Sequence, residues 1–334
     1  MQPGTQEWLD QVVEPIVDPD RKIVDPHHHL WPPGGALPYG VDELVADLTS
    51  GHDVIATVFV ECRAAYRTDG PDHLQPVGET EFVAASAEEI SEHHPGAPTI
   101  GGIVAHADLA ELDVLDEVLD AHTDAAGGRF RGIRDALCHA IDPDGLTIPG
   151  RAPADRASDP AFHNGVRRLG ERGLTYDTWQ YHYQVSELTA LARVADETVI
   201  VCDHFSTPLG VGRFAGQRDE IFTQWRRDIA ELAACPNVVA KLGGMAMPDN
   251  GFGWHTAERP PTSDEFVAAQ ADYYHHAIEV FGPHRCMFES NFPVDRLSLS
   301  YPVLWNALKK IAERYSDDEQ DDMFSGTATR VYRL

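Results

Sequence analysis

Short apolar runs rich in β-branched residues alternate along this chain with longer segments whose apolar residues repeat at helical spacing. Eight of these runs are predicted strands: 22–29, 53–61, 99–107, 130–137, 174–182, 198–205, 237–244 and 285–292. A helical segment follows each strand, and Ser186 and Thr262 are placed to cap two of the helices. Strand and helix repeated eight times predict an α/β protein, a single (β/α)8 TIM barrel without an open sheet edge.

The repeat begins at residue 22, so we predict an N-terminal extension over 1–21 and the barrel over 22–334. A doubly wound sheet is the alternative, but no G-x-G-x-x-G turn follows the first strand and no linker divides the chain. Two long connections, 142–160 and 247–264, leave the carboxyl ends of strands, where barrel enzymes build their sites. We expect both to cover substrate. The tail, FSGTATRVYRL, is predicted to pack on the barrel.

The net charge of the chain limits the classes of partner that it can bind. It has 54 acidic and 26 basic side chains, a formal net charge of −28. Phosphate binding needs the opposite field, so we expect no nucleic-acid partner. So large an excess repels itself unless salt screens it, which leaves two interpretations open: a salt-rich cytoplasm or an ordinary solvated acidic surface.

Location is predicted from apolar runs and cysteines. No run approaches the ~18 apolar residues of a membrane span, so we expect no membrane partner. The acidic start of the chain lacks the basic and apolar regions of a signal peptide. The five cysteines are scattered without disulfide or zinc-cluster spacing and are predicted to be reduced. We therefore expect a cytoplasmic protein.

Candidate chemistry begins in the first strand. Asp25, His27 and His29 alternate there, and a side-chain period of two points them into the barrel mouth while His28 points outward. Two imidazoles roughly 6 to 7 Å apart along a strand can converge on one cation, and neutral histidine suits zinc or manganese. The pattern therefore indicates a metal site.

Further polar residues mark the ends of other strands. Glu61 and Arg63 follow the second strand, His182 ends the fifth, and Lys241 lies in the seventh. These four residues are predicted to bind a small-molecule substrate at the carboxyl ends of the strands. For Lys241, a buried ion pair is the alternative.

Six motifs from strand one to the chain end form a recognisable set: VDPHHHLW, FRGIR, CDH, KLGG, FESNFPVD and FSGTATRVYRL. With them, the chain from about Ile23 to Leu334 resembles the amidohydrolase superfamily. Within it, the chain is similar to the amidohydrolase-related group that holds 2-pyrone-4,6-dicarboxylate lactonase and sugar-acid lactonases.

The resemblance implies roles for individual residues. His27, His29 and His204 correspond to metal-type histidines that hold a divalent cation, or act directly on the substrate carbonyl in a metal-free site. Arg134 corresponds to a substrate-binding arginine, whose planar fork suits a carboxylate or a polarised carbonyl. The fourth strand lacks the lysine that bridges two metals in dinuclear members, so at most one metal, zinc or manganese, is expected.

The eighth strand departs from the family pattern. Where the family has an aspartate that orients or deprotonates water, this chain has Asn291, and an asparagine cannot act as a base. Glu289, two residues earlier on the same strand face, is predicted to accept the proton instead, with Asp203 and Asp295 as further candidates. The predicted catalytic residues are Glu289, Asn291, His204 and Arg134.

These observations predict a hydrolase that opens a small polar or carboxylated lactone by water addition. Three alternatives stay open: a metal-dependent decarboxylase of a small carboxylic acid, an amide hydrolase, and a non-catalytic binding protein that has lost the strand-eight aspartate. The sequence leaves homo-oligomerisation open.

Overall fold

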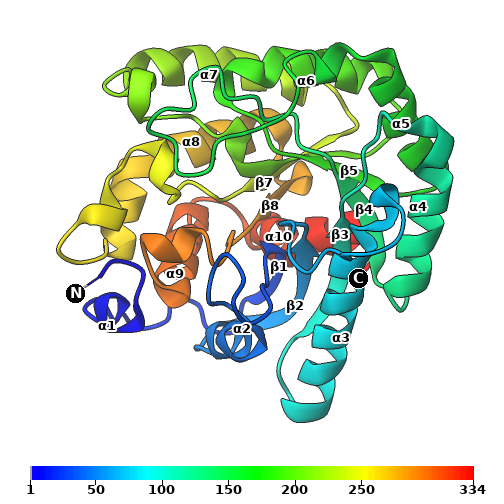
Figure 1. Ribbon diagram of the computed structural model, residues 1–334. Helices are drawn as coiled ribbons and strands as arrows, with labels where there is room; N and C mark the ends of the chain where they lie inside the picture. Colours follow the sequence, from blue (N-terminus) through cyan, green and yellow to red (C-terminus); the bar gives the residue numbers. More distant parts are fainter. Residues whose placement is uncertain (1) are drawn as a thin grey trace.

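A computed structural model describes residues 2–334 as a barrel of parallel strands wrapped by helices (Figure 1). Eight strands pair in sequence order in one sheet, which confirms the predicted fold. Their bounds are β1 Lys22–His28, β2 Asp53–Val60, β3 Thr99–Ala105, β4 Phe130–Arg134, β5 Thr175–Thr178, β6 Ile200–Cys202, β7 Val238–Leu242 and β8 Cys286–Phe288. The segment after β8 closes the barrel on β1, because His29 N donates to Phe292 O and Asn291 N donates to His27 O.

Helices follow the strands on the outside of the barrel, as the helical spacing predicts. They are α2 Val41–Leu48, α3 Val77–His93, α4 Leu112–Ala125, α5 Pro160–Glu171, α6 Val185–Val194, α7 Arg218–Ala233, α8 Ser263–Phe281 and α9 Tyr301–Ala312. The Thr262 side chain caps α8 by accepting from Glu265 N, whereas Ser186 lies inside α6 and the predicted cap there is wrong.

Several strands end earlier than the apolar runs do. The run 198–205 forms a strand only over Ile200–Cys202, and His204 and Phe205 then adopt positive φ. Likewise Asn291, after β8, has φ 54°. His204 and Asn291 each follow a strand at the mouth of the barrel, so the backbone leaves extended geometry where the site begins.

Apolar side chains form a large core between the sheet and the helices and a smaller one inside the barrel. The inner core is built from strand residues and from the C-terminal helix: Val24, Val58, Val60, Val104, Val201, Val239, Met287, Ala328 and Tyr332. That helix, α11 Thr327–Tyr332, follows α10 Asp317–Asp321 and a π-helical turn over Asp322–Gly326. The tail therefore packs on the barrel as predicted, but as a helix.

The residues that precede the barrel pack against its later loops. Helix α1, Gln6–Leu9, buries Trp8, whose Nε1 donates to Ala257 O at 3.2 Å. Glu14 accepts from Ser263 N at the start of α8, at 2.8 Å. The N-terminal segment therefore braces the connection between β7 and α8.

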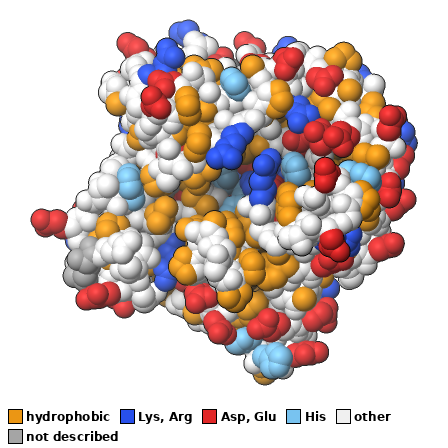
Figure 2. Space-filling view, in the orientation of Figure 1, with side chains coloured by type: hydrophobic (Ala, Val, Ile, Leu, Met, Phe, Trp, Pro, Cys, Tyr) orange, Lys and Arg blue, Asp and Glu red, His pale blue; other side chains and the backbone are white. Residues whose placement is uncertain are grey.

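Acidic side chains are spread over the face seen in Figure 2; some Lys and Arg side chains lie beside the hollow at its centre and others lie near the edge of the view. Within residues 2–334, no helix combines the length and apolarity needed to cross a membrane. All five cysteines are free.

Candidate active site

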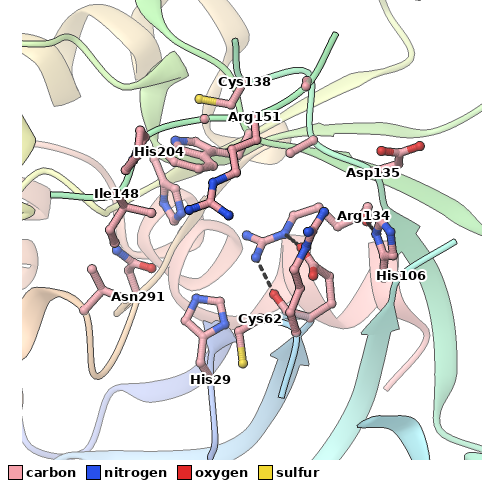
Figure 3. A pocket seen from close by; sticks show the side chains of 18 of the residues that line it. His29, Cys62, His106, Arg134, Asp135, Cys138, Ile148, Arg151, His204 and Asn291 are labelled. Carbon is pink, nitrogen blue, oxygen red and sulfur yellow. Dashed lines mark hydrogen bonds and ion pairs between the residues drawn. The ribbon is translucent and has the colours of Figure 1, made fainter. Parts of the chain in front are cut away.

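A cavity of about 510 Å³ opens at the carboxyl ends of the strands (Figure 3). Six of the predicted site residues line it: His29, Glu61, Arg63, Arg134, His204 and Asn291. The connection 142–160 also contributes, with Thr147 to Pro153 and Arg156 along one wall. This loop therefore forms part of the cavity wall, and its covering of substrate stays a prediction. Of the second long connection, 247–264, only Met247 reaches the lining.

A carboxylate joins two histidines behind the cavity floor. Glu289 Oε1 lies 2.7 Å from His204 Nδ1, and Glu289 Oε2 lies 2.8 Å from His27 Nδ1. Glu289 and His27 are fully buried, whereas His204 lines the cavity. Because Nδ1 of His204 is held by Glu289, its other ring nitrogen is the one left for a substrate. Glu289 is thus not placed to contact water in the cavity directly, and it can act only through a histidine.

Two glycines of the KLGG motif make this arrangement possible. A Cβ on Gly243 would lie 2.3 Å from Glu289 Cγ, and a Cβ on Gly244 would lie 2.4 Å from His204 Nδ1. Gly244 also has φ +69°, which L side chains rarely adopt. The motif therefore leaves room for the carboxylate and the imidazole, a role that sequence spacing did not reveal.

Burial shifts the ionisation of this group. Burial raises the pKa of Glu289 to about 8 and lowers the pKa of His204 to about 3, so the His204 ring is neutral. His27 has its pKa lowered well below the usual value by burial and by the nearby Lys241 ammonium. A neutral imidazole is the form that accepts a proton or binds a cation.

The donor set fits a divalent cation. Ligand atoms of His27, His204 and Glu289 lie within 4.8 Å of one another, and two nitrogens with a carboxylate oxygen suit zinc or manganese. Among the described residues, the buried oxygens Glu289 Oε2 and Asp203 Oδ1 lie close to His27 Nδ1 and Lys241 Nζ but make no hydrogen bond of good geometry, which leaves them available to a cation. His29 is not part of this group; its Nδ1 is bonded to Val60 O at 2.8 Å, which leaves Nε2 on the cavity side.

Arg134 is held in the cavity by a network of acceptors. Its Nε donates to Glu61 Oε1 at 2.8 Å, and its Nη2 donates to the Glu61 carbonyl. Its Nη1 lies 3.3 Å from His27 Nε2 and 3.5 Å from Asp203 Oδ2. Glu61, predicted to bind substrate, is therefore placed mainly to orient the guanidinium.

Asn291 lines the cavity with its amide already engaged. Its Nδ2 donates to Asp295 Oδ1 at 2.9 Å, and this bond does not involve the side-chain carbonyl oxygen of Asn291. Asp295 Oδ2 accepts from Ala246 N at 3.2 Å. Asp295 is buried and occupied by these two bonds, which places it poorly as the alternative base.

Lys241 and Asp203 lie beneath the floor rather than in the cavity wall. Lys241 Nζ is 2.9 Å from Asp177 Oδ2 and 3.3 Å from Asp203 Oδ1, and all three side chains are fully buried. Burial alone would lower the pKa of Lys241, but these carboxylates raise it, so the amine is charged. The geometry matches the buried ion-pair alternative for Lys241 and not direct contact with a substrate.

Two other predicted residues lie elsewhere. His182 is outside the cavity lining, where its Nδ1 accepts from Leu209 N at 3.3 Å. Asp25 does not share the orientation of His27, because the register of β1 with β2 shifts between Asp25 and His28, across Pro26. Its carboxylate instead accepts from Ser290 N and the Tyr301 hydroxyl.

Sequence reasoning missed Arg151, which projects into the cavity from the connection 142–160 (Figure 3). It sits on a small hairpin, since it forms an isolated bridge with His139. Neither Arg151 nor Arg63 has an ion-pair partner among residues 2–334, although the chain is strongly acidic. An arginine in the loop sequence LTIPGRAPADR carries no spacing signal, so only the hairpin geometry identifies it.

The fold and the histidine–carboxylate centre define a barrel enzyme of the hydrolase type. The model of the amidohydrolase family matches residues 24–334, and the chain belongs to this family. The chain is 31% identical over 337 residues to protein y4mH of Sinorhizobium fredii, covering 94% of this chain and 99% of that protein. It is 30% identical over 236 residues to L-fucono-1,5-lactonase of Burkholderia multivorans, covering 70% of this chain and 72% of the lactonase.

A solved structure agrees with these relationships. The crystal structure of a Burkholderia multivorans amidohydrolase with bound zinc matches with a TM-score of 0.70 at 26% identity, covering 93% of this chain and 99% of that chain. The resemblance inferred from the motifs is confirmed, and the chain is an amidohydrolase-type enzyme.

Proposed function

We propose that this enzyme opens a small carboxylated lactone by adding water to the ester carbonyl. The observation that carries the proposal is the His204–Glu289 pair, in which a buried carboxylate holds one ring nitrogen at 2.7 Å while the ring faces the cavity. The similarity to L-fucono-1,5-lactonase supports a cyclic ester as the substrate class.

The residues divide the reaction between them. Above the pKa of Glu289, about 8, His204 accepts a proton from the attacking water, and the ionised Glu289 balances the charge that forms on the ring. Arg134, fixed by Glu61, binds the carbonyl oxygen as negative charge develops on it. The Asn291 side-chain carbonyl orients the water. His204 then returns the proton to the alkoxide that leaves the ring, which completes a hydroxy acid.

Two arginines at the cavity support an anionic substituent on the lactone. Arg63 and Arg151 line it and have no ion-pair partner in the described chain, although acidic side chains outnumber basic ones 54 to 26. A guanidinium binds a carboxylate through two parallel hydrogen bonds. A local positive field inside an acidic protein selects an anion over a neutral ring.

The same side chains also fit a divalent cation. His27, His204 and Glu289 would hold it, and when bound it would polarise the carbonyl and lower the pKa of water. With the cation bound, His204 would serve as a ligand and not as the proton acceptor. The remaining roles of Arg134, Arg63 and Arg151 do not depend on it.

A panel of substrates tests the proposed function. Carboxylated lactones, neutral sugar lactones, amides and aromatic acids are assayed with chelator, zinc or manganese. We expect ring opening of carboxylated lactones at the highest kcat/KM. Release of carbon dioxide from the acids without ring opening of any lactone would instead identify a decarboxylase, and hydrolysis of amides alone would identify an amidase.

Two variants test the assigned pair. His204→Gln and Glu289→Gln should each lower kcat by about a thousandfold, and the double variant should lose little more, because the two groups act as a unit. The matched control is His93→Gln, an exposed histidine at the end of α3. A Glu289→Gln enzyme with turnover near that of the His93 variant would refute the role of the carboxylate.

A further inference from the structure

The C-terminal helix and the floor of the site are joined by one continuous set of buried polar contacts. The Tyr332 hydroxyl donates to Asp177 Oδ2, and the same oxygen lies 2.9 Å from Lys241 Nζ. Lys241 Nζ in turn lies 3.3 Å from Asp203 Oδ1 and 3.4 Å from His27 Nδ1. All five side chains are fully buried. Tyr332, in the last helical turn of the chain, is thus linked to His27 through Asp177 and Lys241.

The choice of tyrosine at this position needs an explanation. The neighbours of Tyr332 inside the barrel are apolar, among them Val24, Val58, Val239 and Met287. A phenylalanine would fill the same space, and a buried hydroxyl costs stability unless it is bonded. The only side-chain acceptor that the described residues offer this hydroxyl is Asp177.

The position of Lys241 depends on Asp177. An ammonium has three donors, and its nearest carboxylate acceptors here are Asp177 and Asp203, while His27 Nδ1 lies 3.4 Å from Lys241 Nζ. Asp177 is itself fixed from two sides, because its Oδ1 accepts from Thr175 Oγ1 at 2.8 Å and its Oδ2 accepts from Tyr332. Loss of the hydroxyl frees one side of this carboxylate and lets the ammonium move relative to His27.

We propose that Tyr332 is a positioning residue for the catalytic centre. Its hydroxyl fixes Asp177, and Asp177 holds the Lys241 ammonium against His27 and Asp203. The C-terminal helix thereby belongs to the functional unit, beyond its packing role at the end of the barrel opposite the cavity. The kinetic part of this inference rests on the proposed lactone hydrolysis.

The test uses full-length enzyme with Tyr332→Phe, Asp177→Asn and the double variant. Tyr332→Phe keeps the ring, so packing is retained and one hydrogen bond to a charged group is lost. We expect kcat to fall about tenfold with KM within about twofold of wild type. The double variant should be no worse than Asp177→Asn, because both changes act on one network.

Tyr39→Phe is the matched control, since its buried hydroxyl also donates to a carboxylate, Asp47 Oδ2 at 2.8 Å, but lies outside the cavity lining. It should lower the melting temperature by a similar amount and leave kcat unchanged. A Tyr332→Phe enzyme with the kcat of the Tyr39→Phe enzyme would overturn the inference.

A spectroscopic readout separates this inference from the proposed function. Ring-nitrogen NMR signals of His27, in protein labelled at histidine and assigned with a His27→Gln variant, should change in Tyr332→Phe and stay fixed in Tyr39→Phe. If wild type opens no lactone, the proposed function fails, while these signals still decide the role of Tyr332. Unchanged His27 signals would refute it.

Discussion

At the scale of single residues, the eighth strand shows how one substitution is matched by its surroundings. Asn291 stands where the resemblance to the family predicts an aspartate, and its Nδ2 donates to Asp295 at 2.9 Å. An aspartate at 291 would bring two buried carboxyl groups to that distance, and like charges so close cannot both ionise. Restoring the family residue alone therefore conflicts with Asp295.

A swap of the two side chains tests this pairing. Asn291→Asp should lower the free energy of unfolding by about 1–3 kcal/mol, the usual cost of an unsatisfied or repelling buried polar pair. Asn291→Asp combined with Asp295→Asn keeps one amide and one carboxyl group, so it should recover most of the loss. Urea unfolding of the two variants measures the difference. Equal stability of the single and double variants would show that the contact contributes nothing.

At the scale of elements, the two long connections cooperate. The Asp249 carboxylate, in the turn Pro248–Asn250 after β7, accepts from Thr147 N at 2.7 Å and from Ile148 N at 3.1 Å. These bonds hold the hairpin that carries Arg151 over the cavity. The aromatic residues of the second connection face elsewhere: Phe252 stacks on Trp254, and Trp254 stacks on Phe266 of α8.

Loosening the hairpin should affect anionic substrates selectively. In Asp249→Asn the amide has one acceptor oxygen, so it can keep only one of the two hydrogen bonds to the hairpin. We therefore expect KM for a carboxylated lactone to rise about tenfold, and we expect the same rise in Arg151→Gln. KM for a neutral lactone should change little in either variant. Arg168→Gln, a surface arginine of α5 that pairs with Glu171, is the matched control. A parallel rise in KM for both lactones would contradict an anion-binding role for Arg151.

The same elements show what the sequence can and cannot predict. Periodicity predicted all eight strands, because their buried faces impose a pattern on the residues. Strand-end chemistry predicted the cavity positions of His29, Glu61 and Arg63, and the family resemblance predicted those of Arg134 and His204. Alternation failed for Asp25, since the register shift at Pro26 changes which way the side chain points. The roles of Gly243, Arg151 and Tyr332 arise from contacts between distant segments, which local spacing does not record.

At the scale of the whole molecule, two electrostatic effects oppose each other: attraction within surface ion pairs, and repulsion among the excess acidic side chains. Many surface ion pairs join an arginine to a highly exposed carboxylate, as in Arg21 with Asp317, which is 90% exposed. Exposed pairs contribute roughly 0–1 kcal/mol each, and salt weakens them. The repulsion summed over a net charge of −28 is screened by the same salt, and it acts on every acidic group at once.

We therefore expect the melting temperature to rise substantially between dilute buffer and molar potassium chloride. At about 1 M salt the Debye length falls to roughly 3 Å, so repulsion across the surface disappears while buried contacts such as Lys241 with Asp177 are little affected. Chloride is preferred to sulfate, because sulfate also strengthens apolar burial.

The matched variant replaces three exposed acids with their amides: Glu89, Glu92 and Asp124, which form no ion pair within residues 2–334. These changes reduce the net negative charge from −28 to −25. This variant should melt higher than wild type in dilute buffer and gain less from salt. A flat melting temperature across the salt range would leave the acidic surface without a role in salt adaptation, and a falling one would show that the ion pairs outweigh the repulsion.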